Sequence, residues 1–425
     1  MLFIYKSLTF FLYPLFVLII FLRIFLKKED KARFKEKIFP STVNYKRGFN
    51  KKLVWFHASS IGELLSIVSL IKNLNNENKN IEFLVTTVTL SSANLLKKNL
   101  SEYNNIVHRF FPLDVQFLIK SFLNTWRPDL VCFIDSEIWP NFLFKIKERK
   151  IPLILLNARI TKKTLNKWKI FPKFAKEVFS NFDLCLASSE ESKNNLKRLG
   201  IKKASYLGNL KFSSKINTNR LSDANKLILN NFKVWCAAST HEGEEEMLIK
   251  SHIILKQKIT NIKTIIIPRH INRVSNIKNL TTKYKLKSQI ISGEEKIDNQ
   301  TEIIIVNSFG VLSKYYEYCK IIFIGKSLLK KFKLVGGQNP IEPAKFGCKI
   351  FHGPYVYNFN EVYNLLKTYK ISMQVNDEKE LSEKLLESFK KLNNSTIKHS
   401  NKLNIYGDNI LKETIKEIKN YISIN

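Results

Sequence analysis

Short apolar runs rich in strand-forming residues alternate with amphipathic segments along most of the chain. Helical periodicity marks segments such as Leu64–Leu74, Ala93–Lys98, Val115–Asn124 and Ser189–Leu199. Regular alternation of strands and helices predicts an α/β protein with parallel sheets covered on both faces. The predicted strands are Leu53–Ala58, Phe83–Thr87, Leu130–Ile134, Leu153–Asn157, Leu184–Ala187, Val234–Ala238, Thr264–Ile267, Gln289–Ile291, Ile303–Val306, Ile321–Ile324 and Lys349–Phe351.

The alternation loosens into polar residues between Gly208 and Asp223 and then restarts. This break predicts two α/β domains, at residues 51–212 and 223–405, joined by a linker at 213–222. A ligand site at a cleft between two such domains is expected. The amphipathic segment Ile410–Ile422 predicts a final helix, within residues 406–425, that lies on one of the two domains.

The N-terminal segment is almost wholly apolar. Leu8–Leu22 carries no charge, and Ile24–Leu26 continues the run after Arg23. If Arg23 extends toward the membrane surface, the span approaches the roughly 20 residues that cross a bilayer. We therefore predict a transmembrane anchor at residues 1–27, with a helix lying on the membrane surface as the alternative. The basic segment 28–50 follows, which predicts that the rest of the protein is cytoplasmic.

The chain contains 70 Lys and Arg against 36 Asp and Glu, a formal net charge of +34. Such an excess favours anionic partners: a membrane surface, phosphorylated substrates or nucleic acid. The alternative is a compositional bias spread over solvated surfaces. No nucleic-acid-binding module is recognisable, so we expect no nucleic-acid partner. The five cysteines lack metal-ligand spacing, which predicts reduced thiols and no metal site.

The stretch Leu53–Ser66 predicts a strand, a tight turn and a helix. The turn places Glu63 at the helix start, beyond the carboxyl end of a parallel strand, where open α/β sheets bind ligands. Ser60 and Glu63 also match a capping box, in which the glutamate only accepts a backbone hydrogen bond. Both interpretations of Glu63 remain open at this point.

Other predicted strands are also followed by polar candidates. Asp135 and Glu137 come after the strand Leu130–Ile134, although such acids often cap the next helix. Arg269 could clamp a phosphate or carboxylate, or it could be an ordinary surface residue. After Val234–Ala238 we consider Ser239, Thr240 and His241 as candidate ligands, and assign the acidic run at residues 242–246 to the helix dipole.

The segment Val335–Pro343 combines two glycines with a predicted helix start. Asn339 is expected to cap that helix, Pro340 to be its first residue, and Glu342 to complete a capping box. A helix start preceded by glycines is suited to anion binding. The chain contains no Walker loop and no GxGxxG, GxSxG or HExxH motif.

Taken together, these stretches resemble the Kdo transferases of Gram-negative bacteria, which add 3-deoxy-D-manno-octulosonic acid (Kdo) to a lipid A precursor. The resemblance implies a GT-B fold of two Rossmann-like domains and inverting transfer from CMP-Kdo to a primary hydroxyl, without a cofactor. It also implies a cell inner-membrane location and a C-terminal helix packed on the N-terminal domain. The matching stretches are HASSIGE (57–63), DSEIWPN (135–141), IPLILLNAR (151–159), GNLKF (208–212), PRH (268–270), GGQNPIEPA (336–344) and GPYVYNF (353–359).

Roles follow from the resemblance where these motifs match. Glu63 would be the proton acceptor, and Glu137 and Lys211 would stabilise the transition state. The CMP site would comprise Pro268, Arg269, Phe309, Gly310, Val311, Asn339, Pro340, Ile341 and Glu342. Three positions depart from the family pattern: Phe309 and Val311 replace the methionine and glutamate of a usual Met-Gly-Glu, and Lys326 replaces a usual glycine.

Two other functions are compatible with parts of the sequence. A GT-B transferase or epimerase that uses a UDP-sugar would share the fold, and a non-catalytic scaffold would tolerate the loss of Glu63.

A helix start would also lower the pKa of Glu63 and weaken it as a base. We therefore expect Glu137 or a dry environment to offset that effect.

Overall fold

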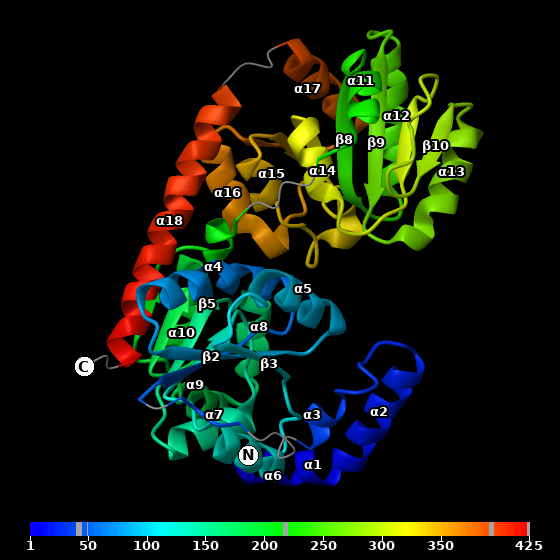
Figure 1. Cartoon of the computed structure of the whole chain (residues 1–425). Coiled ribbons are helices and arrows are strands. Elements are labelled where there is room, and N and C mark those ends of the chain that lie inside the picture. Colours follow the sequence, from blue (N-terminus) through cyan, green and yellow to red (C-terminus); the bar gives the residue numbers. More distant parts are fainter. Residues whose placement is uncertain (40–44, 49, 216–219, 391–394, 423–425) are drawn as a thin grey trace. The chain divides into compact units, whose positions relative to one another are not determined.

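The computed structural model describes residues 1–39, 45–48, 50–215, 220–390 and 395–422. Parts of the predicted basic segment (28–50), linker (213–222) and C-terminal segment (406–425) lie outside the described residues. The chain forms two compact units, Met1–Ser214 with Tyr406–Asn425, and Lys215–Ile405. Each unit is a parallel sheet with helices on its faces (Figure 1).

The first unit contains a seven-stranded parallel sheet in the order β3-β2-β1-β4-β5-β6-β7. Its central strands β4 and β5 are buried along their whole length, as expected for strands covered on both faces. The strands are β1 Lys52–His57, β2 Ile81–Thr87, β3 Ile106–Phe110, β4 Leu130–Ile134, β5 Leu153–Ala158, β6 Leu184–Ala187 and β7 Ala204–Tyr206. The helices after the N-terminal pair are α3 Lys35–Ile38, α4 Ile61–Glu77, α5 Leu90–Leu100, α6 Gln116–Trp126, α7 Pro140–Glu148, α8 Lys162–Trp168, α9 Pro172–Phe179 and α10 Glu190–Arg198, with the 3-10 turn η2 Leu210–Ser213.

The second unit repeats this plan in the order β10-β11-β9-β8-β12-β13-β14, again with parallel pairing. Its strands are β8 Lys233–Thr240, β9 Ile262–Pro268, β10 Ser288–Ile291, β11 Ile303–Val306, β12 Ile321–Ile324, β13 Lys349–His352 and β14 Ser372–Gln374. Its helices are α11 Asp223–Asn230, α12 Glu244–Lys256, α13 Val274–Lys283, α14 Leu312–Tyr318, α15 Ile341–Lys345, α16 Asn360–Thr368 and α17 Glu378–Lys390, with the 3-10 turns η3 Ile271–Arg273, η4 Lys330–Phe332 and η5 Tyr357–Phe359.

All the predicted strands are present, but the sequence pattern missed β3, β7 and β14. Each of these three lies at an edge of its sheet. β3 and β7 are largely half-exposed, and only Ser372 of β14 is buried. Edge strands carry polar residues on their open side, so they lack the continuous apolar run by which central strands are recognised.

The N-terminal apolar segment forms two helices, α1 Leu2–Phe11 and α2 Tyr13–Phe25, bent by 50° with respect to each other. In the described part of the chain, no single helix is long and apolar enough to cross a membrane, whereas this bent pair together is. The segment is therefore not one continuous helix, and the transmembrane anchor at residues 1–27 stays a prediction. Pro14, in the first turn of α2, explains the break, because proline has no N–H to donate to the preceding turn.

The N-terminal pair is held against the first unit by polar contacts. The Tyr5 hydroxyl donates to Asp114 at 2.8 Å, and the Asn141 side-chain amide donates to the Thr9 hydroxyl at 3.0 Å. Beyond α2, the buried Lys37 donates to Glu29 at 2.6 Å and to the backbone carbonyl of Val88 at 2.9 Å. The segment is thus a fixed part of this unit, attached at several points.

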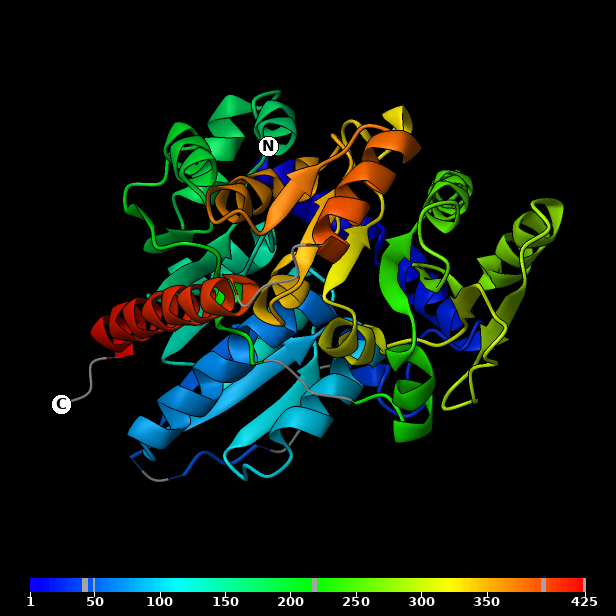
Figure 2. The same ribbon diagram turned by 90° about the horizontal axis from the view of Figure 1, so that it is seen from above.

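The last helix, α18, runs from Ser395 to Ile422, and its portion from Tyr406 onward belongs to the first unit. Figure 2 shows this portion beside α4, where Lys419 forms an ion pair with Glu77. The Tyr406 ring also packs edge-on against Phe212, with ring centroids 5.3 Å apart. The C-terminal helix therefore extends the first unit, although it begins fifteen residues before the predicted Ile410.

Candidate active site

The candidate site of the first unit lies where the order of its strands reverses. β1 is the first strand of the sheet and its neighbours are β2 and β4, so the connections leave in opposite directions from the β1/β4 boundary. Ligands bind open α/β sheets outside the carboxyl ends of the strands at such a point. Glu63 follows β1 and Glu137 follows β4, so the two carboxylates flank this position.

Glu63 caps its own helix and also lies just beyond the carboxyl end of β1. The Ser60 hydroxyl accepts from the Glu63 backbone N–H at 3.3 Å and donates to the Glu63 carboxylate at 2.8 Å. The Ser60 N–H donates to this carboxylate at 3.4 Å, which completes the capping box, and the Ser59 N–H donates to it at 2.7 Å. These bonds hold the partly buried carboxylate in one orientation at the carboxyl edge of the sheet.

The environment raises the pKa of Glu63 to about 7. Burial is the main cause, and the negative charges of Asp135 and Glu137 add to it, while the bonds from Ser60 and Ser59 oppose it. The expected lowering by the helix start is thus outweighed. A carboxylate with this pKa exchanges a proton near neutral pH, as a general base requires.

Glu137 has the opposite electrostatic character. Burial alone would raise its pKa, but His57 and hydrogen bonds from Ser59 and Trp139 lower it below the ordinary value. Its Oε2 atom lies 3.2 Å from His57 Nε2 and accepts from Trp139 Nε1 at 2.6 Å. Glu137 is therefore a fixed anion near Glu63, and the two acids differ in protonation behaviour because their surroundings differ.

Lys211, in η2, reaches the same carboxyl edge of the first sheet. Its ammonium group donates to Asp135 Oδ2 at 2.8 Å, and the other Asp135 oxygen accepts from the Asn157 side-chain amide. Asp135 and Asn157 have φ values of 55° and 51°, in the left-handed region that Asp and Asn tolerate better than most residues. Asp135 therefore positions Lys211, although the sequence analysis assigned Asp135 no catalytic role. The sequence feature that pointed to Asp135 was its place directly after an apolar strand.

The second unit has an equivalent reversal between β8 and β12. The fully buried Glu244, at the start of α12, accepts backbone N–H bonds from His241 (3.0 Å), Lys326 (2.7 Å), Ser327 (2.8 Å) and Leu328 (3.1 Å). Gly325 precedes this loop, and a Cβ there would lie 2.5 Å from the Ser239 carbonyl. Glu244 therefore fixes the loop after β12 to the loop after β8. Assigning the acidic run to the helix dipole missed this function.

The predicted donor-binding residues of the second unit gather at the carboxyl edge of its sheet. Pro268 ends β9, and the exposed Arg269 follows it. Arg269 forms no ion pair among the described residues. The His241 ring lies 5.9 Å from that of His270, centroid to centroid. Phe309, Gly310 and Val311 follow β11, with Phe309 66% exposed and Val311 preceding α14.

The predicted N-cap at Asn339 is wrong by one residue. α15 begins at Ile341, Pro340 is its N-cap residue, and the helix has only five residues. Asn339 still makes a turn, since its Oδ1 atom accepts the Ile341 N–H at 3.0 Å. Burial raises the pKa of Glu342, which forms no capping box. A helix of this length has only a weak dipole. Anion binding at this place therefore depends on side chains and on the N–H groups of the loop.

Within the described ranges, no group of three or more His, Cys, Asp or Glu side chains could hold a metal ion.

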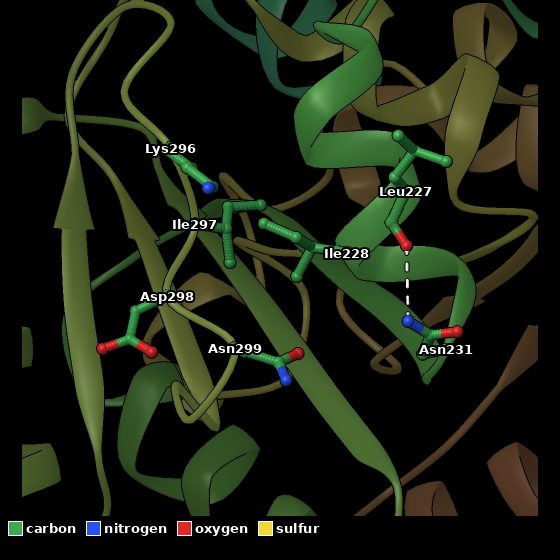
Figure 3. Close-up of a pocket in the computed structure, with 7 residues that line it drawn as sticks. All are labelled: Leu227, Ile228, Asn231, Lys296, Ile297, Asp298 and Asn299. Carbon is green, nitrogen blue, oxygen red and sulfur yellow. Dashed lines mark hydrogen bonds between the residues drawn. The ribbon is translucent and has the colours of Figure 1, made fainter.

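A cavity of about 660 Å³ lies in the second unit, between α11 and the segment that precedes β11 (Figure 3). Its lining residues are Leu227, Ile228, Asn231, Lys296, Ile297, Asp298 and Asn299. Because these residues precede β8 and β11, the cavity lies at the amino edge of the sheet and contains none of the predicted site residues.

Solved structures share the fold of this chain. A putative UDP-N-acetylglucosamine 2-epimerase from Listeria monocytogenes superposes with a TM-score of 0.61 over 87% of this chain and 96% of that one. The sequence identity is 13%, so this likeness shows the fold alone. It supports a GT-B-like fold, in which each chain has two parallel-sheet α/β domains.

Sequence relatives give the family. Residues 32–214 match the family model described as 3-deoxy-D-manno-octulosonic-acid transferase (kdotransferase). The 3-deoxy-D-manno-octulosonic acid transferase of Rickettsia bellii is 31% identical over 96% of this chain and 94% of its own length. That of Haemophilus influenzae is 28% identical over 79% of this chain and 78% of its own. The chain therefore belongs to the 3-deoxy-D-manno-octulosonic acid transferase family and is a glycosyltransferase.

Proposed function

We propose that this enzyme transfers Kdo from CMP-Kdo to the primary hydroxyl of a lipid A precursor, lipid IVA, in lipopolysaccharide core biosynthesis. The observation that carries the proposal is the pair formed by Glu63, with a pKa of about 7, and the anionic Glu137 at the strand-order reversal of the first unit. A transferase that activates an alcohol needs a base of this kind.

In the proposed reaction, Glu63 accepts the proton of the acceptor hydroxyl as that oxygen attacks the anomeric carbon of Kdo. Positive charge develops on the sugar ring in such a transition state, and the fixed anion of Glu137 stabilises it. Lys211, held by Asp135, supplies the balancing cation at the same edge. The bond to the CMP phosphate breaks on the opposite face, which gives inversion.

The donor is proposed to bind at the carboxyl edge of the second sheet. Arg269 supports this assignment, because it is exposed and has no ion-pair partner among the described residues. A guanidinium group can bind a phosphate through two parallel hydrogen bonds. Pro268, Phe309–Val311 and Asn339–Glu342 complete the proposed CMP site, with Val311 contributing backbone atoms.

The direct test is to incubate the purified full chain with lipid IVA and CMP-Kdo and to determine the mass of the product. The proposal requires a mass increase of one or more Kdo units. The same incubation with UDP-sugars tests the UDP-sugar alternative. Transfer from a UDP-sugar, with none from CMP-Kdo, would contradict the proposal.

We propose further that α1 and α2 attach the enzyme to the cytoplasmic side of the inner membrane by inserting together. The contacts of Tyr5 and Thr9 face the first unit, while the other side of the pair is strongly apolar and exposed. Lysines and arginines of the following segment can bind anionic headgroups. The exposed large apolar residues of the pair and its end are Met1, Phe3, Ile4, Leu8, Phe10, Phe11, Leu15, Leu18, Ile19, Phe21, Leu22, Phe25 and Leu26.

Replacing Phe11 and Phe25 by aspartate is expected to weaken vesicle binding by at least about tenfold, since each buried phenylalanine contributes roughly 1.5–3 kcal/mol. Their side chains are 77% and 86% exposed, so the fold does not depend on them. Sedimentation with vesicles containing anionic lipid measures the effect, and raising the salt concentration should weaken the remaining binding. Leu227→Asp, at a 70% exposed position of α11, is the matched control. Equal losses in both variants would refute this attachment surface.

The rate of transfer is expected to fall as the pH drops below about 7, because Glu63 must be ionised to accept a proton. The rate falls in this pH range because the pKa of Glu63 is raised. A carboxyl group with an ordinary pKa would stay ionised, and the enzyme active, well below pH 6. The pH dependence of kcat/KM across this range reports the ionisation of Glu63 in the free enzyme, the state to which this pKa belongs. A flat profile down to about pH 5 would contradict the role of Glu63 as base.

A further inference from the structure

His57, the last residue of β1, is fully buried and has partners on both ring nitrogens. Its Nδ1 atom lies 3.0 Å from the Thr86 hydroxyl oxygen and 3.3 Å from the Thr86 carbonyl. Its Nε2 atom lies 3.2 Å from Glu137 Oε2. The ring stacks on Phe111, with centroids 3.7 Å apart and planes 17° apart, so it cannot turn freely.

The partners of this ring determine where its hydrogen lies. An ionised carboxylate only accepts hydrogen bonds, so Nε2 must carry a hydrogen that points at Glu137. On the other side, the Thr86 hydroxyl accepts from Trp55 Nε1 at 2.8 Å, and its own hydrogen can be donated to Nδ1 at 3.0 Å or to the Phe56 carbonyl at 3.4 Å. In either charge state of the ring, the Nε2 hydrogen faces Glu137.

Glu137 is also held by its other neighbours. Trp139 Nε1 donates to the same Oε2 atom at 2.6 Å, and the Ser59 side chain forms a further bond to this carboxylate. The Ser59 backbone N–H meanwhile donates to Glu63 at 2.7 Å. The two acids are therefore linked through Ser59, and a displacement of Glu137 would change the surroundings of Glu63.

We propose that His57 is a positioning residue for catalysis: its Nε2–H, oriented by Thr86 and Phe111, fixes the carboxylate of Glu137 beside Glu63. The inference rests on the proposed function, because it assigns His57 a role through Glu137 in the transfer of Kdo. His57 itself does not touch the substrate. Its loss acts on the chemical step and leaves substrate binding unchanged.

The test compares His57→Gln with His57→Asn in the full chain. The amide nitrogen of glutamine reaches the position of Nε2, whereas that of asparagine reaches only the position of Nδ1. We expect kcat for CMP-Kdo and lipid IVA to stay within about threefold of wild type in His57→Gln and to fall about 10–100-fold in His57→Asn, with KM for both substrates unchanged. Equal activity in the two variants, or a loss confined to KM, would overturn the proposal.

Because both substitutions are buried, nitrogen NMR of the unmodified enzyme with labelled histidine provides a second measurement. The proposal requires Nε2 of His57 to carry a hydrogen throughout the active pH range and its signal to shift in Glu137→Gln. An unprotonated Nε2 would overturn it even if no His57 variant folds. The proposed function is judged separately, since it fails only if wild-type enzyme forms no Kdo product.

Discussion

Glu63→Gln is expected to lower the rate of Kdo transfer by about 10²–10⁴-fold, the usual contribution of a general base. The amide has nearly the same shape, and its oxygen can keep the bond from the Ser59 N–H. Its NH2 group then takes the place of the other oxygen, where the Ser60 hydroxyl can accept instead of donate. It cannot accept the proton of the acceptor hydroxyl. Transfer of Kdo under saturating conditions measures the loss, and binding of CMP-Kdo by calorimetry should be unchanged.

The stability of the same variant separates a lost base from a damaged fold. The pKa of Glu63 in the fold is about 7, above its ordinary value of 4.5, so the folded protein binds the extra proton between these values. The stabilising contribution is therefore present at low pH and is lost as the pH rises through 7. Relative to wild type, the melting temperature of Glu63→Gln should rise between about pH 5 and pH 8.

Glu190→Gln is the matched control for Glu63→Gln. Glu190 also lies in the first turn of a helix of the first unit, with its side chain 57% exposed and paired with Lys193 at 3.2 Å. We expect near-normal transfer from this variant. Comparable losses in both variants, or near-normal turnover in Glu63→Gln, would exclude Glu63 as the base.

The second large effect is expected at Glu244. Removing its carboxylate by Glu244→Ala leaves four backbone N–H groups in a buried place without their acceptor. Each buried unsatisfied donor costs about 1–3 kcal/mol, and relaxation of the loop recovers part of this, so we expect a loss of about 3–5 kcal/mol. Glu244→Gln should lose less, because its amide oxygen still accepts.

Hydrogen exchange locates this effect. The amides of Lys326, Ser327 and Leu328 should exchange at least about tenfold faster in Glu244→Gln, which corresponds to about 1.4 kcal/mol of lost protection. Binding of CMP-Kdo should weaken in parallel, because these residues follow β12 at the strand-order reversal of the second unit. Glu246→Gln, in the same first turn but paired at the surface with Tyr284, should change neither quantity. Unaltered exchange at all three amides in Glu244→Gln would contradict the role assigned to Glu244.

The site was predictable from the sequence only in part. The positions of Glu63 and Glu137 after apolar strands, and the motif around each, mark them as candidates. No local pattern indicates that His57 bonds to Glu137 or that Asp135 binds Lys211, because these pairs are 80 and 76 residues apart. The pKa difference between Glu63 and Glu137 depends on these same partners.

The errors of prediction also have local causes. The break in the N-terminal helix depends on Pro14, which a hydropathy count treats as one more uncharged residue. α15 begins at Ile341, one residue after the predicted first residue Pro340, because Asn339 closes a turn of its own with the Ile341 N–H. The acidic run was assigned to the helix dipole, yet Glu244 turns inward to accept bonds from a loop more than eighty residues away.

The sequence by itself determined the strands and helices of the two sheet cores, the division near residue 214 and the residue types at each strand end, because periodicity and turn chemistry are local properties of the chain. Only the tertiary structure decided the order of the strands, and hence which strand ends meet at β1/β4 and at β8/β12. It also decided that the pKa of Glu63 is raised to about 7 while that of Glu137 is lowered. Burial and charge pairing depend on residues that only folding brings together.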